Sequence, residues 1–227
     1  EYAPGEFTLT QDLMGTRYVV LILRTFVNAN DPADIKTANA LQDAVTVAQD
    51  DPGAFEVPDW NIEQVETLRK AINVLAATKE DTSGFFGDKS EINPIDHLLG
   101  TAFGWGGNPK EATIYLNAAP EKNDGKTPHT MTITDKVPVE DGGFVSITMY
   151  NKEGYMQEND LKMYSVNNVT ADRNEDGTVT IHAGGCEDGR KNCLPITEGW
   201  NYIIRLYKPS PEIISGDYQF PTFEVSK

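Results

Sequence analysis

Oxygen-bearing side chains at alternate positions precede a glycine in the second half of the chain. Asp172, Asn174 and Asp176 take the first, third and fifth places, and a glycine takes the sixth. Calcium loops place their oxygen ligands with this spacing before a sharp turn. The bidentate glutamate that closes such a loop would stand at position 183, which is Ala183. The segment is therefore either a calcium site completed by a carboxylate from another loop, or a β-turn whose acidic residues face water.

Two cysteines, Cys186 and Cys193, stand seven positions apart in a loop rich in glycine and charged residues. This separation suits a small loop closed by a disulfide, a bond that persists in oxidising compartments. The alternative is a pair of reduced cysteines at the end of a strand. A sequon at Asn168 would permit glycosylation in such a compartment. The cysteines therefore favour a secreted, periplasmic or cell-surface protein.

Large aromatic side chains flank several loops of the chain. Trp105, Tyr155 and Trp200 are flat rings of the kind that sugar-binding surfaces use. If these rings lie on the surface, a polysaccharide is the expected partner. The alternative is that they are buried at the ends of a β-sandwich.

No residue pattern identifies a reaction. The three histidines, His97, His129 and His182, are far apart, and no pair has metal-binding spacing. The chain lacks the Gly-x-Ser-x-Gly motif of a nucleophilic serine. Paired carboxylates such as Glu140-Asp141 and Glu158-Asp160 suit glycoside hydrolysis only if folding sets two of them about 5–10 Å apart. The sequence therefore does not decide whether the protein is an enzyme, and it indicates no cofactor other than calcium.

The chain of 227 residues is strongly acidic, with 35 acidic and 19 basic residues and a formal net charge of −16. This charge repels nucleic acid and anionic membranes and favours solubility. The longest apolar run, Tyr18–Leu23, stops at Arg24, far short of the ~20 residues of a membrane-spanning helix. The chain begins at Glu1 without a methionine, so either a leader has been removed or this is a piece of a longer protein.

The first half of the chain combines one apolar strand pattern with helical patterns. Residues Arg17–Phe26 are rich in Val, Leu and Ile and predict a buried strand. Apolar periodicity and capping residues predict three helices, at Asp34–Val47 after the Asp31-Pro32 start, at Ile62–Ala77 after a cap at Asp59 or Asn61, and from Asn93-Pro94 to near Gly100. Between the last two helices, Phe85-Phe86 must find a pocket or a partner.

From Ala112 onward the apolar pattern changes to period two, with turn residues every eight to twelve positions. This pattern is typical of a β-sandwich or barrel. The predicted strands are Ala112–Ala119, His129–Asp135, Phe144–Tyr150, Lys162–Val166, Thr178–Ala183, Tyr202–Lys208 and Tyr218–Phe223. Asp-Gly pairs predict hairpin turns at Asn123-Asp124-Gly125 and Glu175-Asp176-Gly177.

An ordered set of motifs in the second half carries a family resemblance. The segments are Gly104-Trp105-Gly106-Gly107, Tyr115-Leu116-Asn117, Asn123-Asp124-Gly125-Lys126, Phe144–Tyr150, Tyr164-Ser165-Val166, Asn174–Ile181, Asn192-Cys193-Leu194-Pro195 and Arg205-Leu206-Tyr207-Lys208-Pro209. Taken in order, they resemble the bacterial domain-of-unknown-function family twelve-fourteen. The chain departs from the family pattern at two usual tryptophans, where it has Val145 and Cys193.

The resemblance implies a fold and a layout but no reaction. It implies an exported protein and a mainly β (α+β) fold, a jelly-roll-like antiparallel β-sandwich preceded by a short section of two to three helices. Such a domain usually forms the C-terminal half of two-domain proteins whose N-terminal half is family twelve-fifty-four, and most of that partner is missing here. The expected division is residues 1–30 as the end of the partner domain, 31–103 as the helical section and 104–227 as the sandwich.

Two hypotheses of function follow. The first is a non-catalytic, structural or self-assembling subunit, because the apolar strand Arg17–Phe26 must pair with its own sandwich or with that of a neighbour. Pairing with a neighbour predicts a homo-oligomer or larger assembly. The alternative is an extracellular carbohydrate-binding module or polysaccharide-acting hydrolase, based on the loop aromatics and scattered carboxylates.

Overall fold

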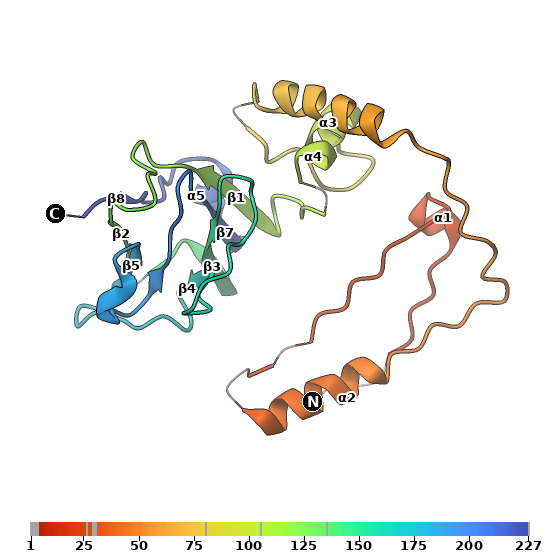
Figure 1. Ribbon diagram of the computed structural model, residues 1–227. Helices are drawn as coiled ribbons and strands as arrows, with labels where there is room; N and C mark the ends of the chain where they lie inside the picture. The colour runs from red at the N-terminus through yellow and green to blue at the C-terminus, as the bar shows by residue number, and fades with distance from the viewer. Residues whose placement is uncertain are drawn as a thin grey trace. The chain divides into compact units, whose positions relative to one another are not determined.

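A computed structural model describes residues 5–25, 27–28, 31–79, 81–104, 106–134 and 136–226 (Figure 1). The chain forms two compact units, Glu1–Asp59 and Trp60–Lys227. The helices are α1 (Gln11–Met14), α2 (Pro32–Asp43), α3 (Ile62–Ala76), α4 (Pro94–Gly104), α5 (Pro211–Ile214) and a 3-10 helix, η1 (Cys186–Asp188). The strands are β1 (Thr113–Ala118), β2 (His129–Ile133), β3 (Val139–Tyr150), β4 (Ser165–Asn167), β5 (Val179–Ala183), β6 (Cys193–Leu194), β7 (Asn201–Pro209) and β8 (Glu224–Val225).

Helix α2 of the first unit begins where its capping residues predict. The Asp31 carboxylate accepts a hydrogen bond from the backbone N–H of Ala33 at 2.9 Å, and Pro32 takes the first helical position. The helix ends at Asp43, four residues before the predicted end at Val47. The capping signal therefore fixed the start of this helix, whereas its end lacks a comparable signal.

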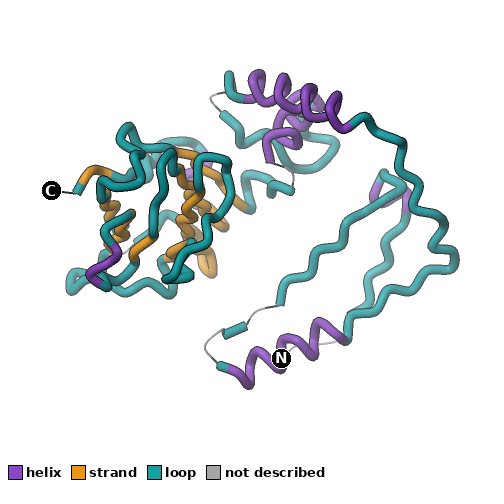
Figure 2. Tube along the Cα trace, viewed as in Figure 1, coloured by secondary structure: helices purple, strands orange, loops and turns teal. Residues whose placement is uncertain are grey.

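The predicted buried strand Arg17–Phe26 is wrong for the residues that the structure describes. Residues 17–25 form no strand, Phe26 lies outside the described residues, and the large side chains of Tyr18–Leu23 are exposed. Figure 2 shows the described residues of the first unit as helix and loop only. An apolar, β-branched run becomes a strand only where another strand supplies hydrogen-bonding partners, and the described residues of this unit contain none.

Helices α3 and α4 of the second unit enclose a small core of their own. Helix α3 begins at the predicted cap Asn61, whose side chain accepts from the backbone N–H of Gln64 at 3.1 Å. Phe85 is buried with Ala76 and Leu99. The aromatic pair of the loop has therefore found a pocket inside its own unit, one of the two outcomes expected from the sequence.

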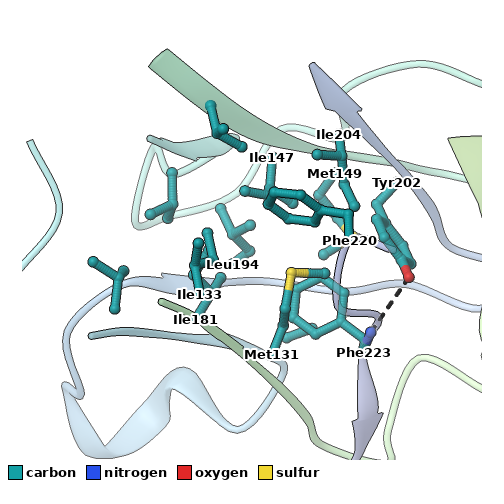
Figure 3. Packing of buried hydrophobic residues seen from close by; sticks show 14 of the residues in the cluster. Met131, Ile133, Ile147, Met149, Ile181, Leu194, Tyr202, Ile204, Phe220 and Phe223 are labelled. Atoms are coloured by element: carbon teal, nitrogen blue, oxygen red, sulfur yellow. Dashed lines mark hydrogen bonds between the residues drawn. The ribbon is translucent and has the colours of Figure 1, made fainter. Parts of the chain in front are cut away.

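Residues from β1 onward build two four-stranded sheets. The strand orders are β1-β7-β3-β4 and β6-β5-β2-β8, and every pair is antiparallel except the parallel pair β5–β6. Side chains of both sheets meet in one apolar core, where Ile147 and Ile204 of the first sheet face Met131 and Ile181 of the second (Figure 3). The predicted mainly β, α+β fold is confirmed, and the two sheets do not close into a barrel.

The C-terminal strand predicted at Tyr218–Phe223 is wrong. Phe220 and Phe223 are buried but lie in irregular backbone, and the short strand β8 that follows pairs with β2. Figure 3 shows the Phe223 backbone N–H donating to the Tyr202 hydroxyl, at 3.3 Å. The aromatic side chains of this segment pack into the core although its backbone forms no ladder, so an apolar pattern alone did not define a strand.

The two predicted hairpin turns do not join hairpins. The Asn123-Asp124-Gly125 turn lies between β1 and β2, and the Glu175-Asp176-Gly177 turn lies between β4 and β5; in both cases the two strands belong to different sheets. At the second, the Gly177 backbone N–H donates to the Asn174 carbonyl at 3.0 Å. At the first, the Asp124 carboxylate accepts from the backbone N–H groups of Lys126 and Thr127 at 2.9 and 2.7 Å, as Asp does in turns. The strands that flank each turn pair with strands distant in sequence, so the turns did not determine the strand pairing.

Candidate functional site

The loop between β5 and β6 is closed by a disulfide. Cys186 and Cys193 are bonded, with their Cα atoms 5.7 Å apart, and both are buried. The predicted disulfide is therefore present. Glycines at both ends of η1, Gly185 and Gly189, have positive φ angles of 67° and 74°, which lets the chain reverse within this short loop.

Charged residues of the same loop pair with one another. The Arg190 Nε lies 2.9 Å from both carboxylate oxygens of Asp188, and the Arg190 backbone N–H donates to the same carboxylate at 3.0 Å. Hydrogen bonds from the Arg190 side chain, and then from its backbone, lower the pKa of Asp188 to about 2. Because the pair is exposed, it orders the loop more than it stabilises the fold.

A pocket of about 360 Å³ lies beside this disulfide. Its apolar lining comes from Leu161, Met163, Val166, Ala171 and the two cysteines. Its polar lining comes from Ser165, Thr170, Asp172, Arg190, Lys191 and Asn192. The lining is thus about equally apolar and polar, and a volume of this size is within the usual range for a binding site.

Hydrogen bonds of Asn192 join the two chain segments that form the pocket. Its side-chain oxygen accepts from the Asp172 backbone N–H at 3.0 Å, and its Nδ2 donates to the carbonyls of Asp172 and Thr180 at 2.7 and 3.0 Å. Asn192 adopts a positive φ of 50°, a conformation that asparagine tolerates better than most residues. These bonds hold the segment before β5 against the start of β6.

The pocket lies at one edge of each sheet, since β4 and β6 are edge strands and residues of both line it. On the first sheet, the backbone N–H of Asn168 donates to the Val145 carbonyl at 3.1 Å, and the backbone N–H of Met149 donates to the Tyr164 carbonyl at 2.9 Å. This alternation points the peptide groups of Tyr164, Val166 and Asn168 toward β3 and those of Ser165 away from it. The edge of β4 at Ser165 is therefore available to another strand.

Strand β6 also has peptide groups that point away from its neighbouring strand. His182 donates its backbone N–H to the Asn192 carbonyl at 3.0 Å, and Gly184 donates to the Leu194 carbonyl at 2.9 Å. The peptide groups of Cys193, between these two acceptors, therefore point away from β5. Ser165 and Cys193 both line the pocket, so the pocket lies between two strand edges.

Two of the predicted calcium residues, Asn174 and Asp176, make hydrogen bonds to the threonines that follow them. The Asn174 Nδ2 donates to the hydroxyls of Thr178 and Thr180, both at 2.8 Å. The Asp176 carboxylate accepts from the Thr178 hydroxyl at 2.7 Å and backbone N–H at 3.0 Å, which lowers its pKa. Asp172 lines the pocket instead. Within the described ranges no group of three or more His, Cys, Asp or Glu side chains could hold a metal ion, and calcium binding stays a prediction.

The two predicted surface aromatics that the structure describes, Trp200 and Tyr155, differ in burial. Trp200 has 0% of its surface exposed and packs against His129, Tyr202 and Phe223. Its prediction as a ligand-binding ring is wrong, because its side chain lies in the core between the sheets. Tyr155 is 72% exposed, and Trp105 lies outside the described residues.

The sequon residue Asn168 supports the edge of the first sheet. Its side-chain oxygen accepts from the backbone N–H of Val145 at 2.7 Å, and the residue is half-buried. The side chain is therefore held on β3 while Val169 and Thr170 are exposed. Glycosylation at this position stays a prediction.

An arginine lies on the outer face of the first sheet among aromatic rings. Arg205 donates to the Thr148 hydroxyl at 3.1 Å and to the Tyr150 hydroxyl at 2.8 Å. Its guanidinium carbon lies 5.9 and 5.8 Å from the ring centres of Tyr115 and Tyr150. Among the ion pairs between described residues, none involves Arg205. The cation is held by rings and hydroxyls, without a carboxylate.

The pocket was missed by sequence reasoning, although three of its residues were predicted for other reasons. Cys186, Cys193 and Asp172 were singled out as disulfide and calcium residues, and the structure places all three on this pocket. Leu161, Met163 and Lys191 carry no sequence signal, since they come from two segments whose meeting depends on the sandwich.

Comparison with known proteins supports the fold of the second half. Residues 111–211 match the model of DUF1214, a protein family of unknown function. The VPA0106 protein from Vibrio parahaemolyticus is similar in structure, with a TM-score of 0.55 and 23% sequence identity over 96% of this chain and 61% of that one. An uncharacterized protein from Burkholderia cenocepacia aligns with a TM-score of 0.38 and 22% identity over 58% of this chain and 33% of that one.

The likeness to the Vibrio protein supports the fold and says nothing of an activity. The chain spans 61% of the Vibrio protein, and at such identity the likeness is one of fold alone. No curated protein matches the chain. In the part of the chain that the structure describes, no helix has the length and apolar character needed to cross a membrane.

Proposed function

We propose that this chain is an exported β-sandwich protein that assembles with copies of itself through the apolar segment Val19–Leu23. The observation that supports this role is the exposure of the five aliphatic side chains, from 46% at Val19 to 78% at Val20. In the described residues the segment belongs to no strand. The disulfide supports export, because such bonds persist in oxidising compartments.

Exposure of the apolar side chains of Val19–Leu23 to water is unfavourable. Each aliphatic side chain of this type gains on the order of 1.5–3 kcal/mol when it is fully removed from water. A β-branched, extended run with free peptide groups gains main-chain hydrogen bonds as well when it is added to a sheet edge. Donation of the segment to a neighbouring molecule satisfies both requirements.

The native mass in solution tests this proposal. By size-exclusion chromatography with light scattering, we expect the chain to have a multiple of 25.1 kDa. The double variant Val20→Asp/Ile22→Asp should return to 25.1 kDa, because two charges in the segment would have to be buried on assembly. The matched control is Val47→Asp/Val57→Asp, which charges two exposed valines of the same unit outside the segment. A parent that is monomeric at about 100 µM, or a control that dissociates equally, contradicts the proposal.

A second candidate function is carbohydrate binding at the outer face of the first sheet. Arg205 pairs with no carboxylate among the residues that the structure describes, in a chain of net charge −16, and this favours a ligand that brings its own carboxylate. Phe144 and Tyr207 stack on the same face with ring centres 4.3 Å apart, and such rings suit the apolar face of a sugar. The expected ligand is an acidic polysaccharide.

Retention on immobilised acidic and neutral polysaccharides tests this second candidate. The Arg205→Gln variant should bind an acidic polysaccharide at least tenfold more weakly than the parent, since a charge-assisted contact is lost. Lys208→Gln, on the same strand, is the matched control and should bind like the parent. Absence of retention of the parent, or equal losses in both variants, counts against carbohydrate binding.

A further inference from the structure

We infer that the pocket beside the disulfide binds a small zwitterion, an amino acid or short peptide that carries an ammonium group, a carboxylate and an aliphatic side chain. The inference does not depend on assembly, because every residue that lines the pocket belongs to the second unit. Cations, a carboxylate and an apolar wall all occur in this lining, and each matches one part of such a ligand.

The lining contains a cation and a carboxylate that the protein leaves unpaired. Lys191 and Asp172 both line the pocket. Among the residues that the structure describes, neither the Lys191 ammonium nor the Asp172 carboxylate has an ion pair or a hydrogen bond. A ligand with a single charge would be attracted by one of these groups and repelled by the other. A zwitterion satisfies both, since its carboxylate suits Lys191 and its ammonium group suits Asp172.

The second cation of the lining, Arg190, already has a carboxylate partner. Its Nε lies 2.9 Å from both carboxylate oxygens of Asp188, a residue that does not line the pocket. The charge of Arg190 is therefore largely balanced by Asp188 from outside the pocket. Lys191 is thus the cation of the lining on which a ligand carboxylate would depend most.

The two unpaired charges come from backbone segments that are fixed against each other. Asn192 follows Lys191 in the chain, and its side chain bonds to both the backbone N–H and the carbonyl of Asp172, at 3.0 and 2.7 Å. The disulfide between Cys193 and Cys186 holds the same segment. The backbones that carry Lys191 and Asp172 are therefore positioned before a ligand arrives, which lowers the entropic cost of binding.

The apolar part of the lining fits an aliphatic side chain. It consists of Leu161, Met163, Val166, Ala171 and the disulfide. Leu161 is 50% exposed, so a ligand that covers it gains from the burial of apolar surface. The volume of about 360 Å³ lies near the lower end of the range of about 300–1,000 Å³ for small-molecule pockets. The pocket therefore suits a ligand of the size of leucine or a dipeptide.

Titration of the full ¹⁵N-labelled chain with leucine, followed by backbone amide NMR, tests the site. We expect saturable shifts with a Kd on the order of 1 mM or tighter, as befits so small a ligand. The amide signals of Ser165 and Cys193 should move, because their peptide groups point away from the neighbouring strands and both residues line the pocket. A parallel titration with leucyl-leucine shows whether the peptide or the free amino acid binds more tightly.

Three leucine analogues test the three parts of the ligand separately. Isocaproate has the same skeleton without the ammonium group, isoamylamine lacks the carboxylate, and glycine lacks the aliphatic side chain. Each should bind about tenfold more weakly than leucine, the usual effect of losing one charge-assisted contact or a buried aliphatic group. Isocaproate or isoamylamine bound as tightly as leucine would overturn the zwitterion site.

Two variants assign the ends of the ligand to the two charged residues. Lys191→Gln should weaken leucine about tenfold and leave isoamylamine unchanged, whereas Asp172→Asn should weaken leucine about tenfold without weakening isocaproate. The matched controls are Lys122→Gln and Glu175→Gln, which remove exposed charges outside the lining and should bind leucine like the parent. The site is overturned if neither leucine nor leucyl-leucine binds, if the shifts spare Ser165, or if the controls lose as much affinity as the pocket variants.

Discussion

Replacing Trp200 by alanine is expected to lower the free energy of unfolding by about 3–5 kcal/mol, the usual cost of removing a large aromatic side chain from a core. Trp200 is fully buried, and its ring centre lies 5.3 Å from that of His129 and 5.7 Å from that of Phe223. It packs at the start of β7, between the two sheets. Urea unfolding followed by circular dichroism measures the change.

The matched control for this variant is Trp60→Ala, because Trp60 is 60% exposed. An exposed substitution of this kind should change the free energy of unfolding by no more than about 0.5 kcal/mol. If Trp200→Ala were as mild as the control, the indole would lie on the surface, and its prediction as a ligand-binding ring would regain its basis.

The Gly125→Ala variant is expected to destabilise the protein by on the order of 3 kcal/mol. Gly125 has a φ of +71°, and a Cβ added there would lie 2.4 Å from the Glu198 backbone nitrogen and 2.5 Å from the Thr197 carbonyl carbon. The left-handed conformation contributes about 1–2 kcal/mol, and the displacement of backbone by overpacking contributes about 1–3 kcal/mol. Thermal and urea unfolding both report the loss.

Gly154→Ala separates these two causes. Gly154 has a similar φ of +85°, but no atom lies within 4 Å of the added Cβ. Only the conformational cost of about 1–2 kcal/mol should remain. Equal losses in the two variants would show that the close approach of Gly125 to the Glu198 backbone is not a constraint on the fold.

The tight contact at Gly125 joins the connection between the sheets to the start of β7. The Gly199 backbone N–H donates to the Asn123 carbonyl at 2.7 Å, and Asp124 forms a β-bridge with Glu198. Backbone hydrogen bonds from Thr127 and Lys126 lower the pKa of Asp124 to about 2. The turn therefore remains ordered well below neutral pH, since its carboxylate stays ionised.

The sequence by itself determined the local elements of this protein. Period-two alternation located the strand that contains Val145 and Ile147, and both residues are fully buried. The capping residues Asp31 and Asn61 located the starts of α2 and α3. The spacing of Cys186 and Cys193 indicated their disulfide. These features depend on residues within a few positions of one another, so a linear pattern contains what specifies them.

Features that depend on contacts between segments distant in sequence were decided only by the tertiary structure. Trp200 could have faced water or the core, and Arg17–Phe26 needed a strand that the described part of its own unit does not contain. The Asp-Gly turns formed as predicted but connect different sheets. The pocket beside the disulfide joins residues around Leu161 to residues around Cys193. Such a pocket exists only where two segments distant in sequence meet, and the sequence of neither segment specifies the other.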